Sequence, residues 1–264
     1  MSDKDGRDQG GRKPGGKGGR GSGAGHGIVA AARPTQSRRG QLIAAGAVVL
    51  VLVVVIGGVL YERSQTGPVN DGYGSAQNAR VSVGDGVVRV GATNAPVTLD
   101  VYEDFLCPIC GQFEGLYGQQ VAQAQDQGKV AVSYHFLDFL NPSSASKDYS
   151  SRAAGAALCV ASDGDGSAFP AFHTVLFTTS NQPKEKADVD LTNAQLASLA
   201  GTAGASQAAQ QCIAAGTRVS AAQAASQSGQ SRLESVTGRV GTPTILNGTA
   251  QVNFNDRSWL TKLS

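Results

Sequence analysis

The chain has 264 residues, which is enough for one domain of ordinary size with appendages or for two small domains. Residues 1–40 hold nine Lys and Arg against three Asp, a net charge of +6, whereas residues 62–264 hold thirteen basic against seventeen acidic residues, a net charge of −4. A mildly acidic globular part argues against nucleic-acid binding as the main function, because that function requires a basic surface.

The N-terminal segment combines a basic, Gly-rich tail with a long apolar run. Residues 1–40 cannot bury enough apolar surface to fold, so we expect a disordered tail. Leu42 to Tyr61 is a run of twenty uncharged residues, and a helix of that length matches the roughly 30 Å hydrocarbon core of a bilayer. We therefore predict an uncleaved signal anchor over residues 41–61. The alternatives are a cleaved signal peptide, whose apolar core is usually shorter, and a buried helix, which rarely lacks a polar face.

Flanking charge predicts the orientation of this anchor. Arg33, Arg38 and Arg39 precede the span, with six more basic residues upstream, whereas only the pair Glu62-Arg63 follows it closely. The positive-inside bias places the N-terminus in the cytoplasm and the rest of the chain outside the plasma membrane. Four cysteines, an even number, suit that oxidising side of the membrane.

After a polar tether over residues 62–78, the sequence shows alternating signals for short strands and helices. Gly84-Asp85-Gly86 separates two valine-rich runs and indicates a hairpin. Pro108 marks the start of a helix that continues to about Ala124, because apolar residues then follow at helical spacing. The expected strands are residues 81–83, 87–90, 97–102, 130–136, 244–246 and 250–252.

Residues 144–235 are expected to be entirely helical, with Gly, Asp, Asn and Pro breaks between the helices. We also expect a short closing helix over Trp259–Leu263. A strand–helix–strand unit, a helical block and a final hairpin together predict the α/β fold class. Abundant Gly and Ala favour helices with small-residue faces rather than a heavy aromatic core. The candidate helices of the block are residues 153–160, 169–177, 191–200, 207–215 and 219–233.

Cys107-Pro108-Ile109-Cys110 stands where a strand leads through a short loop into a helix, a context that makes this common pattern specific. Unpaired backbone N–H groups and the positive end of the helix dipole stabilise a thiolate at Cys107 and lower its pKa below the free value of about 8.5. A thiolate is the nucleophile of disulfide exchange. Cys110, one turn further, is placed to attack the resulting mixed disulfide and release the substrate.

A purely structural disulfide and a zinc site are weaker interpretations of this cysteine pair. A structural disulfide would close a ring of only four residues and gain little stability. A zinc site would need a second Cys-x-x-Cys or a Cys/His pair at ligand spacing, which the sequence lacks. We therefore predict redox chemistry without a metal or a dissociable cofactor, because the Cys107–Cys110 disulfide itself carries the electrons.

The segment VYEDFLCPIC closely resembles the active-site segment of DsbA-like oxidoreductases, and Phe113-Glu114 falls where that family often has an aromatic residue and an acid. Gly241-Thr242-Pro243-Thr244 resembles the family's cis-proline loop. The resemblance covers about residues 79–264. It implies a thioredoxin-like fold in two parts, residues 79–143 and 236–264, around an inserted helical domain at residues 144–235. The Gly- and Ala-rich composition would suit a GC-rich bacterium such as an actinobacterium.

Carried over to this chain, the resemblance implies that Cys107 is the nucleophile and Cys110 the resolving cysteine. It also implies that Pro243 is a cis-proline beside Cys107 and that the backbone of Thr242 pairs with the substrate. From the sequence alone, Pro243 indicates only a turn. Substrates would be unfolded or partly folded exported proteins, and an unidentified membrane redox partner would re-oxidise the cysteine pair.

Two positions depart from the family's pattern. Ile109 stands where the best-studied oxidases have His, and it offers neither a hydrogen bond nor a charge to the Cys107 thiolate. We therefore expect a less depressed pKa and a less oxidising disulfide. Val101 replaces the buried acid that many thioredoxin-like proteins have six residues before the first Cys. Asp104 or Glu103 is a candidate for the proton-transfer role; the alternative is that both are solvated loop acids.

The remaining cysteines and the histidines are expected to have structural roles. Cys159 and Cys212 are 53 residues apart on predicted helices; we expect a structural disulfide, with a second redox pair as the alternative. His173 lies on an apolar helical stripe, which predicts packing, and a place beside the active-site cleft is the alternative. His135 in a strand is also expected to pack, and His26 in the tail supports no inference.

The sequence therefore predicts a thiol–disulfide oxidoreductase that forms or rearranges disulfides in exported proteins. An extracytoplasmic disulfide reductase, which Ile109 keeps open, and a non-catalytic thioredoxin-fold binding protein are the alternatives. The intact Cys-x-x-Cys pair argues against the last of these.

Overall fold

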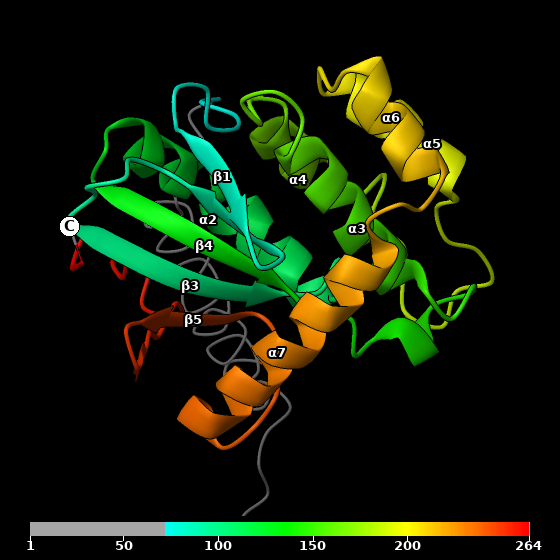
Figure 1. Cartoon of the computed structure of the whole chain (residues 1–264). Helices are drawn as coiled ribbons and strands as arrows, with labels where there is room; N and C mark the ends of the chain where they lie inside the picture. The colour runs from blue at the N-terminus through cyan, green and yellow to red at the C-terminus, as the bar shows by residue number, and fades with distance from the viewer. Residues whose placement is uncertain (1–71, 264) are drawn as a thin grey trace, which may run out of the picture. The chain divides into compact units, whose positions relative to one another are not determined.

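A six-stranded mixed sheet with helices on both faces forms the part of the protein that the computed structural model describes, residues 72–263 (Figure 1). The strand order is β1-β2-β4-β3-β5-β6. β3 and β4 run parallel, and the other neighbouring strands of this sheet are antiparallel. All six predicted strands are present: β1 (Val81–Gly84), β2 (Val87–Val90), β3 (Val97–Glu103), β4 (Val130–Phe136), β5 (Thr244–Asn247) and β6 (Ala250–Gln251).

The predicted helices are also present. Helix α2 (Pro108–Asp126) is the crossover that a parallel pair of strands requires. In the helical block, α3 begins four residues earlier and α7 ends four residues later than the sequence pattern indicates. The other helices are η1 (Asn141–Ser143), α3 (Tyr149–Ala161), α4 (Phe169–Leu176), α5 (Asn193–Thr202), α6 (Gln207–Ala214) and α7 (Val219–Thr237).

The short helix expected over Trp259–Leu263 is wrong, because these residues form turns. Five residues are too few for a stable isolated helix. Their apolar side chains pack without one: Trp259 is buried against the rings of Phe113 and Tyr117 of α2. The apolar residues of this segment therefore reflect packing against α2 and not helix formation.

The two faces of β3 belong to two different hydrophobic clusters. Leu99 and Val101 are part of the large cluster that also includes residues of α2, α3 and α4. Tyr102 points the other way, into a small cluster with Leu233 of α7. Figure 1 shows the same arrangement, with α7 in front of the sheet and α2 behind it. Consecutive residues at the end of β3 therefore point alternately into two different cores.

The core combines small-residue helices with an aromatic cluster that the composition did not suggest. Helix α3 is buried along almost its whole length, and a Cβ at Gly155 would lie 3.0 Å from the backbone nitrogen of Val219 at the start of α7. This close approach needs small residues. Five aromatic rings nevertheless surround His173 of α4: Phe105, Tyr134, Phe136, Phe169 and Phe177.

No helix within residues 72–263 is long and apolar enough to cross a membrane. The predicted tail, the predicted anchor over residues 41–61 and most of the predicted tether lie outside the described residues.

A disulfide joins Cys159 of α3 to Cys212 of α6, as the sequence led us to expect. It closes a loop of 53 residues that contains α4 and α5. Loops of this length restrict the unfolded chain strongly, so the chain-entropy model assigns the cross-link about 4 kcal/mol at most.

Replacing both Cys159 and Cys212 with Ala should lower the free energy of unfolding by about 2–4 kcal/mol, because the unfolded chain regains its loop entropy. Urea denaturation of the oxidised protein and of the double variant measures the difference. The reactivity of Cys107 should stay unchanged. If Cys159–Cys212 were reduced at the same reductant concentration as Cys107–Cys110, the structural role would be wrong.

Candidate active site

Cys107 caps the N-terminus of α2. Its sulfur accepts a hydrogen bond from the backbone N–H of Cys110 at 3.3 Å. Pro108 occupies the first helical turn, where backbone N–H groups have no partner within the helix, so the N–H that proline lacks is not needed there. Both cysteines are free thiols in this structure. Cys107 is 4% exposed and Cys110 is completely buried, whereas Ile109 between them is 47% exposed. The sulfur of Cys107 is thus the one that a substrate can reach.

The loop before β5 lies directly beside Cys107. β5 pairs antiparallel with β3 in a register that sets Thr244 opposite Tyr102, so the residues just before Thr244 reach the loop that leads to Cys107. The Thr242–Pro243 peptide bond is cis. The Cys107 thiol donates a hydrogen bond to the backbone carbonyl of Thr242 at 3.4 Å. Segments 135 residues apart in the sequence therefore meet at one sulfur atom.

The two thiols have very different acidities. The pKa of Cys107 is lowered to about 6, chiefly because the Cys110 thiol donates a hydrogen bond to it, and the backbone N–H groups of Ile109 and Cys110 act in the same direction. Burial raises the pKa of Cys110 well above its ordinary value. Near neutral pH, Cys107 is thus the thiolate and Cys110 keeps its proton.

Glu103 and Asp104, the two acids before the cysteine motif, are both completely buried, so the interpretation of them as solvated loop acids is wrong. Asp104 accepts hydrogen bonds from Ser150 of α3 and from the backbone N–H groups of Leu106 and Leu140, at 2.6, 2.9 and 3.1 Å. Burial raises its pKa to about 7. Through these three hydrogen bonds, Asp104 links the active-site loop to the helical block.

Glu103 has fewer partners than Asp104. One carboxylate oxygen lies 3.0 Å from Nε2 of His173, and the other has no hydrogen-bond partner among the described residues. Burial raises the pKa of Glu103 to about 8. The Glu103 carboxyl is therefore protonated at neutral pH, close to the cysteine pair.

Glu114 and His173 form a buried cluster with Glu103, and the sequence did not predict this cluster. His173 Nδ1 lies 3.9 Å from a carboxylate oxygen of Glu114. One possible metal-ligand atom from each of Glu103, Glu114 and His173 lies within 4.8 Å of the other two. Burial raises the pKa of Glu114 to about 8 and lowers that of His173. The predicted packing of His173 is confirmed, and the alternative, a place beside the active site, holds as well, because His173 contacts Glu103. That the chain needs no metal stays a prediction.

His135, predicted to pack within a strand, lies on the other face of the sheet. Its ring stacks on Tyr102 with 4.4 Å between ring centres, and its Nε2 is 3.0 Å from a carboxylate oxygen of Asp100. His135 therefore belongs to the packing of α7 and not to the cysteine site. His26 lies outside the described residues.

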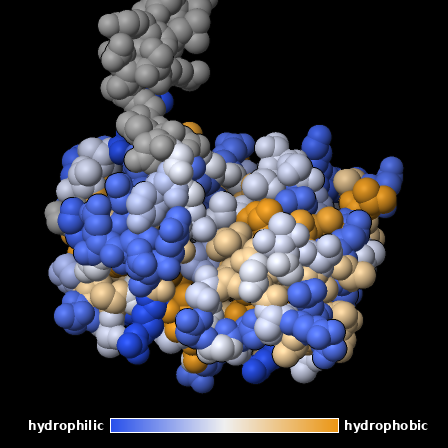
Figure 2. Space-filling model, turned by 90° about the horizontal axis from the view of Figure 1, so that it is seen from above, coloured by the Kyte–Doolittle hydropathy of each residue, from blue (hydrophilic) through white to orange (hydrophobic). Residues whose placement is uncertain are grey.

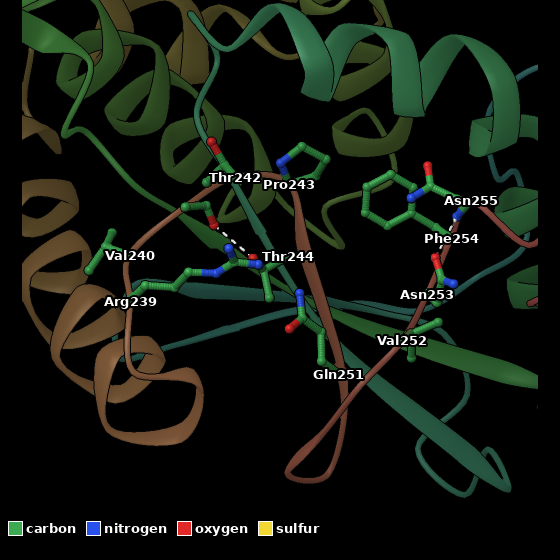
Figure 3. A pocket seen from close by; sticks show the side chains of 11 residues that line it. Arg239, Val240, Thr242, Pro243, Thr244, Gln251, Val252, Asn253, Phe254 and Asn255 are labelled. Carbon is green, nitrogen blue, oxygen red and sulfur yellow. Dashed lines mark hydrogen bonds between the residues drawn. The ribbon is translucent and has the colours of Figure 1, made fainter.

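Two hollows flank the cysteine motif. A cavity of about 560 Å³ runs from the cis-proline loop along β5 and β6, and Figure 3 shows the side chain of Arg239 extending across it toward Thr244. A second hollow of about 270 Å³ includes the exposed side chains of Ile109 and Leu116. Phe254 lines both hollows. The two therefore offer a continuous binding surface on either side of this ring.

The surface chemistry suits short-lived contacts. The face drawn in Figure 2 is mostly polar, and its apolar residues form several small patches and not one broad area. Large, contiguous apolar patches are the usual mark of permanent interfaces. Small apolar patches are more compatible with weak, transient binding than with a permanent interface.

Comparison with known proteins places this geometry in a family. The thioredoxin family model Thioredoxin_4 matches residues 83–259. Among solved structures, DsbA from Mycobacterium tuberculosis in its oxidised form is 31% identical, covers 70% of this chain and 90% of its own, and has a TM-score of 0.55. DsbG of the same organism, in its reduced form, is 32% identical, covers 66% of this chain and 84% of its own, and has a TM-score of 0.56.

A third solved structure supports the fold. MdbA, a thiol-disulfide oxidoreductase from Corynebacterium diphtheriae, is 24% identical, covers 74% of this chain and 98% of its own, and has a TM-score of 0.64.

The curated relatives are longer proteins than this chain. The serine/threonine-protein kinase PknE from M. tuberculosis is 39% identical over 179 residues, which are 68% of this chain. The chain spans about a third (31%) of the length of that kinase, so the match concerns one part of a larger protein. The family model and the two mycobacterial structures decide the classification: the chain belongs to the thioredoxin family, among its DsbA-like thiol–disulfide oxidoreductases.

Proposed function

We propose that this protein forms or rearranges disulfides in exported proteins through Cys107 and Cys110. One observation is decisive for this proposal: a low-pKa thiol at a helix N-terminus lies 3.4 Å from the backbone of a cis-proline loop, next to a surface hollow. A buried structural thiol would need neither a lowered pKa nor access to such a hollow.

The oxidising reaction needs only the two cysteines and the substrate. A substrate thiolate attacks the Cys107 sulfur of the Cys107–Cys110 disulfide, that bond breaks, and Cys110 leaves and takes up a proton. A second substrate thiolate then attacks the substrate sulfur of the mixed disulfide and releases Cys107 as a thiolate. Two electrons thereby pass from the substrate to the cysteine pair, and a membrane redox partner must remove them. The low pKa of Cys107 makes it a good leaving group in the last step.

The cis-proline loop supports the proposed mode of substrate binding. The Thr242 carbonyl oxygen lies 3.4 Å from the Cys107 sulfur, so a substrate chain that pairs with the Thr242 backbone would hold its own sulfur close to the Cys107 sulfur. The exposed side chains of Ile109 and Leu116 offer apolar contacts on the neighbouring surface. Backbone pairing and small apolar contacts bind many sequences weakly, as unfolded substrates require.

Ile109 bears on the direction of electron flow. Its side chain can donate no hydrogen bond to the thiolate, and the Cys107 pKa of about 6 lies between the free value of about 8.5 and the value of about 3.5 in a strongly oxidising DsbA. A less stabilised thiolate makes the reduced form less favourable. The disulfide should therefore be less oxidising than that of DsbA. For this reason, the refolding experiment is paired with a measurement of how fast the protein reduces folded disulfides.

We also propose that residues 41–61 anchor the protein in the plasma membrane, with residues 1–40 in the cytoplasm and the catalytic domain outside. The uncharged run Leu42–Tyr61 and the basic residues before it support this orientation. The Cys159–Cys212 disulfide suits an oxidising compartment.

The oxidised protein should restore activity to a reduced, unfolded test enzyme that has several disulfides. Cys107→Ala should abolish this refolding, because it removes the sulfur that the substrate attacks. Cys110→Ala, first converted by oxidised glutathione to a mixed disulfide at Cys107, should exchange glutathione for the substrate and accumulate protein–substrate mixed disulfides, visible on non-reducing gels. Faster reduction of folded disulfides than oxidation of thiols would favour the reductase. Full complementation of a deletion strain by Cys107→Ala would favour the non-catalytic binding protein.

The ultraviolet absorbance of the thiolate should report the titration of Cys107 with a midpoint near pH 6 in the reduced protein, because the Cys110 thiol and two backbone N–H groups stabilise the charged form. Ile109→His should lower this midpoint and raise the reduction potential toward about −120 mV, the value of DsbA. Cys107→Ser is the control that removes the transition. A wild-type midpoint near 8.5 would contradict the proposed activation.

In cells, the full chain should remain in the membrane pellet after alkaline extraction, because an apolar span of about 30 Å holds it in the bilayer. Protease added outside should remove the catalytic domain and spare a tag fused to the N-terminus. Release of a mature, soluble domain would instead show that the segment is a cleaved signal peptide.

A further inference from the structure

The surface beside Cys107 differs in charge from the rest of the described domain. Residues 72–263 contain fifteen acidic and twelve basic residues. The two hollows that flank the cysteine motif, which we together call the substrate groove, are lined by two arginines, Arg239 and Arg257, and by no Asp or Glu of the described residues. A domain with an excess of acids therefore presents positive charge where substrates are proposed to bind.

We propose that Arg239 selects acidic substrates: its guanidinium group binds the carboxylate of an Asp or Glu that lies a few residues from the cysteine reacting with Cys107. This inference rests on the function proposed above, and it names the class of exported protein that the groove favours.

The local structure fixes the backbone of Arg239 at the start of the cis-proline loop. Helix α7 ends at Gly238, which has the left-handed conformation with a φ of 73°. The hydroxyl oxygen of Thr237 accepts a hydrogen bond from the Arg239 N–H at 3.4 Å and lies 2.8 Å from the Arg239 carbonyl oxygen. Arg239 is therefore held three residues before Thr242, the residue whose backbone is proposed to pair with the substrate.

The guanidinium group of Arg239 is available for a ligand. Its side chain is exposed, extends across the larger cavity toward Thr244 (Figure 3), and forms no ion pair or hydrogen bond with the described residues. Arg152, by contrast, lies 2.7 Å from carboxylate oxygens of both Asp148 and Asp190. A guanidinium carries five N–H donors in a planar fork that matches a carboxylate, so Arg239 has the chemistry of the Arg152 site without its acids.

The acids closest to the groove in the sequence do not take the place of a substrate carboxylate. Asp256 follows the groove residue Asn255, but its carboxylate is bound by Lys262 and by the Ser258 hydroxyl. Glu234, five residues before Arg239, does not line the groove. The chain thus leaves the positive charge of Arg239 unneutralised within the larger cavity.

Arg239 also sets the sign of the charge in this cavity. It is the one charged residue among the eleven that line the cavity of about 560 Å³. The other polar side chains there are neutral amides and hydroxyls, which can hydrogen-bond to substrates of either charge. They are Thr242, Thr244, Gln251, Asn253 and Asn255.

The open edge of β5 provides the path along which a substrate chain meets Arg239. Strand β6 pairs with β5 only at Leu246 and Asn247, and the hydrogen bond from the Val252 N–H to the Ile245 carbonyl, at 2.9 Å, continues that pairing by one step. The larger cavity lies beside Thr244 and the loop before it. An extended substrate can add to such an edge by backbone pairing.

The length of this path determines which substrate positions Arg239 can reach. The three residues from Arg239 to Thr242 span about 10 Å if extended, at about 3.3 Å per residue. A substrate carboxylate two to four residues from the reacting cysteine is therefore within reach. Because a paired strand has one direction, the carboxylate that Arg239 binds must lie on one side of that cysteine only.

The test uses peptides that contain two cysteines joined by a Gly/Ser linker. The four positions on each side of the first cysteine carry Asp, Asn or Lys, one position at a time. Reduced peptide is mixed with the oxidised protein, so the two peptide thiols become a disulfide and the Cys107–Cys110 disulfide becomes two thiols, with transfer of two electrons and two protons. Acid quenching and mass spectrometry give the second-order rate constant.

A neutral oxidant corrects for the effect of a neighbouring charge on the peptide thiol itself. Each rate constant is divided by that of the same peptide with 2-hydroxyethyl disulfide, which is uncharged. The wild-type protein should then prefer Asp to Lys by about fivefold at one or two positions on one side of the cysteine, the range of an exposed ion pair. This preference should shrink at about 1 M salt, where the Debye length is about 3 Å.

Variants of Arg239 assign the preference to its side chain. At the same peptide positions, Arg239→Gln should abolish the preference for Asp, and Arg239→Glu should reverse it in favour of Lys. Arg239→Lys should keep part of it, because the charge remains and the planar fork is lost. Each comparison is a ratio within one variant, so it does not depend on the overall rate of that variant.

Arg218→Gln is the matched control, because it makes the same change in net charge at an exposed arginine before α7 that does not line the groove. This variant should keep the wild-type preference. A wild-type protein without a preference, a preference that persists at the same positions in Arg239→Gln, or an equal loss in Arg218→Gln would overturn the assignment to Arg239.

The two proposals fail in distinguishable ways. If the oxidised wild-type protein oxidises none of the peptides, the Asn series included, the proposed function fails and the selection of acidic substrates fails with it. If it oxidises all of them at rates that do not depend on their charge, only the role of Arg239 is wrong.

Discussion

The active site depends above all on the end of β3, where one strand is paired on both sides. Its parallel pairing with β4 requires the crossover helix α2, whose first turn carries the two thiols. Its antiparallel pairing with β5 sets Thr244 opposite Tyr102 and thereby places the cis-proline loop at the Cys107 sulfur. The cysteine motif is local in the sequence, but its environment is created by strand pairing over more than 130 residues.

The same strand end determines the protonation chemistry. Leu99, Val101 and Glu103 follow the two-residue period of a strand, so Glu103 points into the core that surrounds His173. Burying an acid without a fixed cation favours its neutral form. Asp104 lies beyond the strand, and its three donors make it a structural fastener. Two neighbouring acids thus take different roles because the strand ends between them.

Local signals predicted most of the fold, and long-range contacts account for what was missed. Pro108 and the spacing after it identified α2, and the glycine-rich turn identified the β1–β2 hairpin, because those signals act within a few residues. The closing segment at Trp259 was misjudged because its apolar residues pack on α2 without forming a helix. At the site, the cysteines were identified by their motif, whereas the burial of Glu103 depends on β3 extending one residue beyond the predicted strand. The contact of His173 with Glu103 spans 70 residues and depends on how the helical block docks, which no local pattern encodes.

Helix α2 gives the two thiols of one cysteine pair very different surroundings. The proposed substrates need a sulfur that they can reach through weak, adaptable contacts, whereas the thiol of Cys110 needs a buried environment in which it keeps its proton. A helix separates such demands well, because residues three or four positions apart share one face and the intervening residues point elsewhere. Ile109 and Leu116 face the groove, and Glu114 and Gly118 face the helical block. The inserted block therefore contributes more than a cover for the sheet: its His173 lies 3.0 Å from the buried Glu103 at the end of β3, close to the cysteine pair.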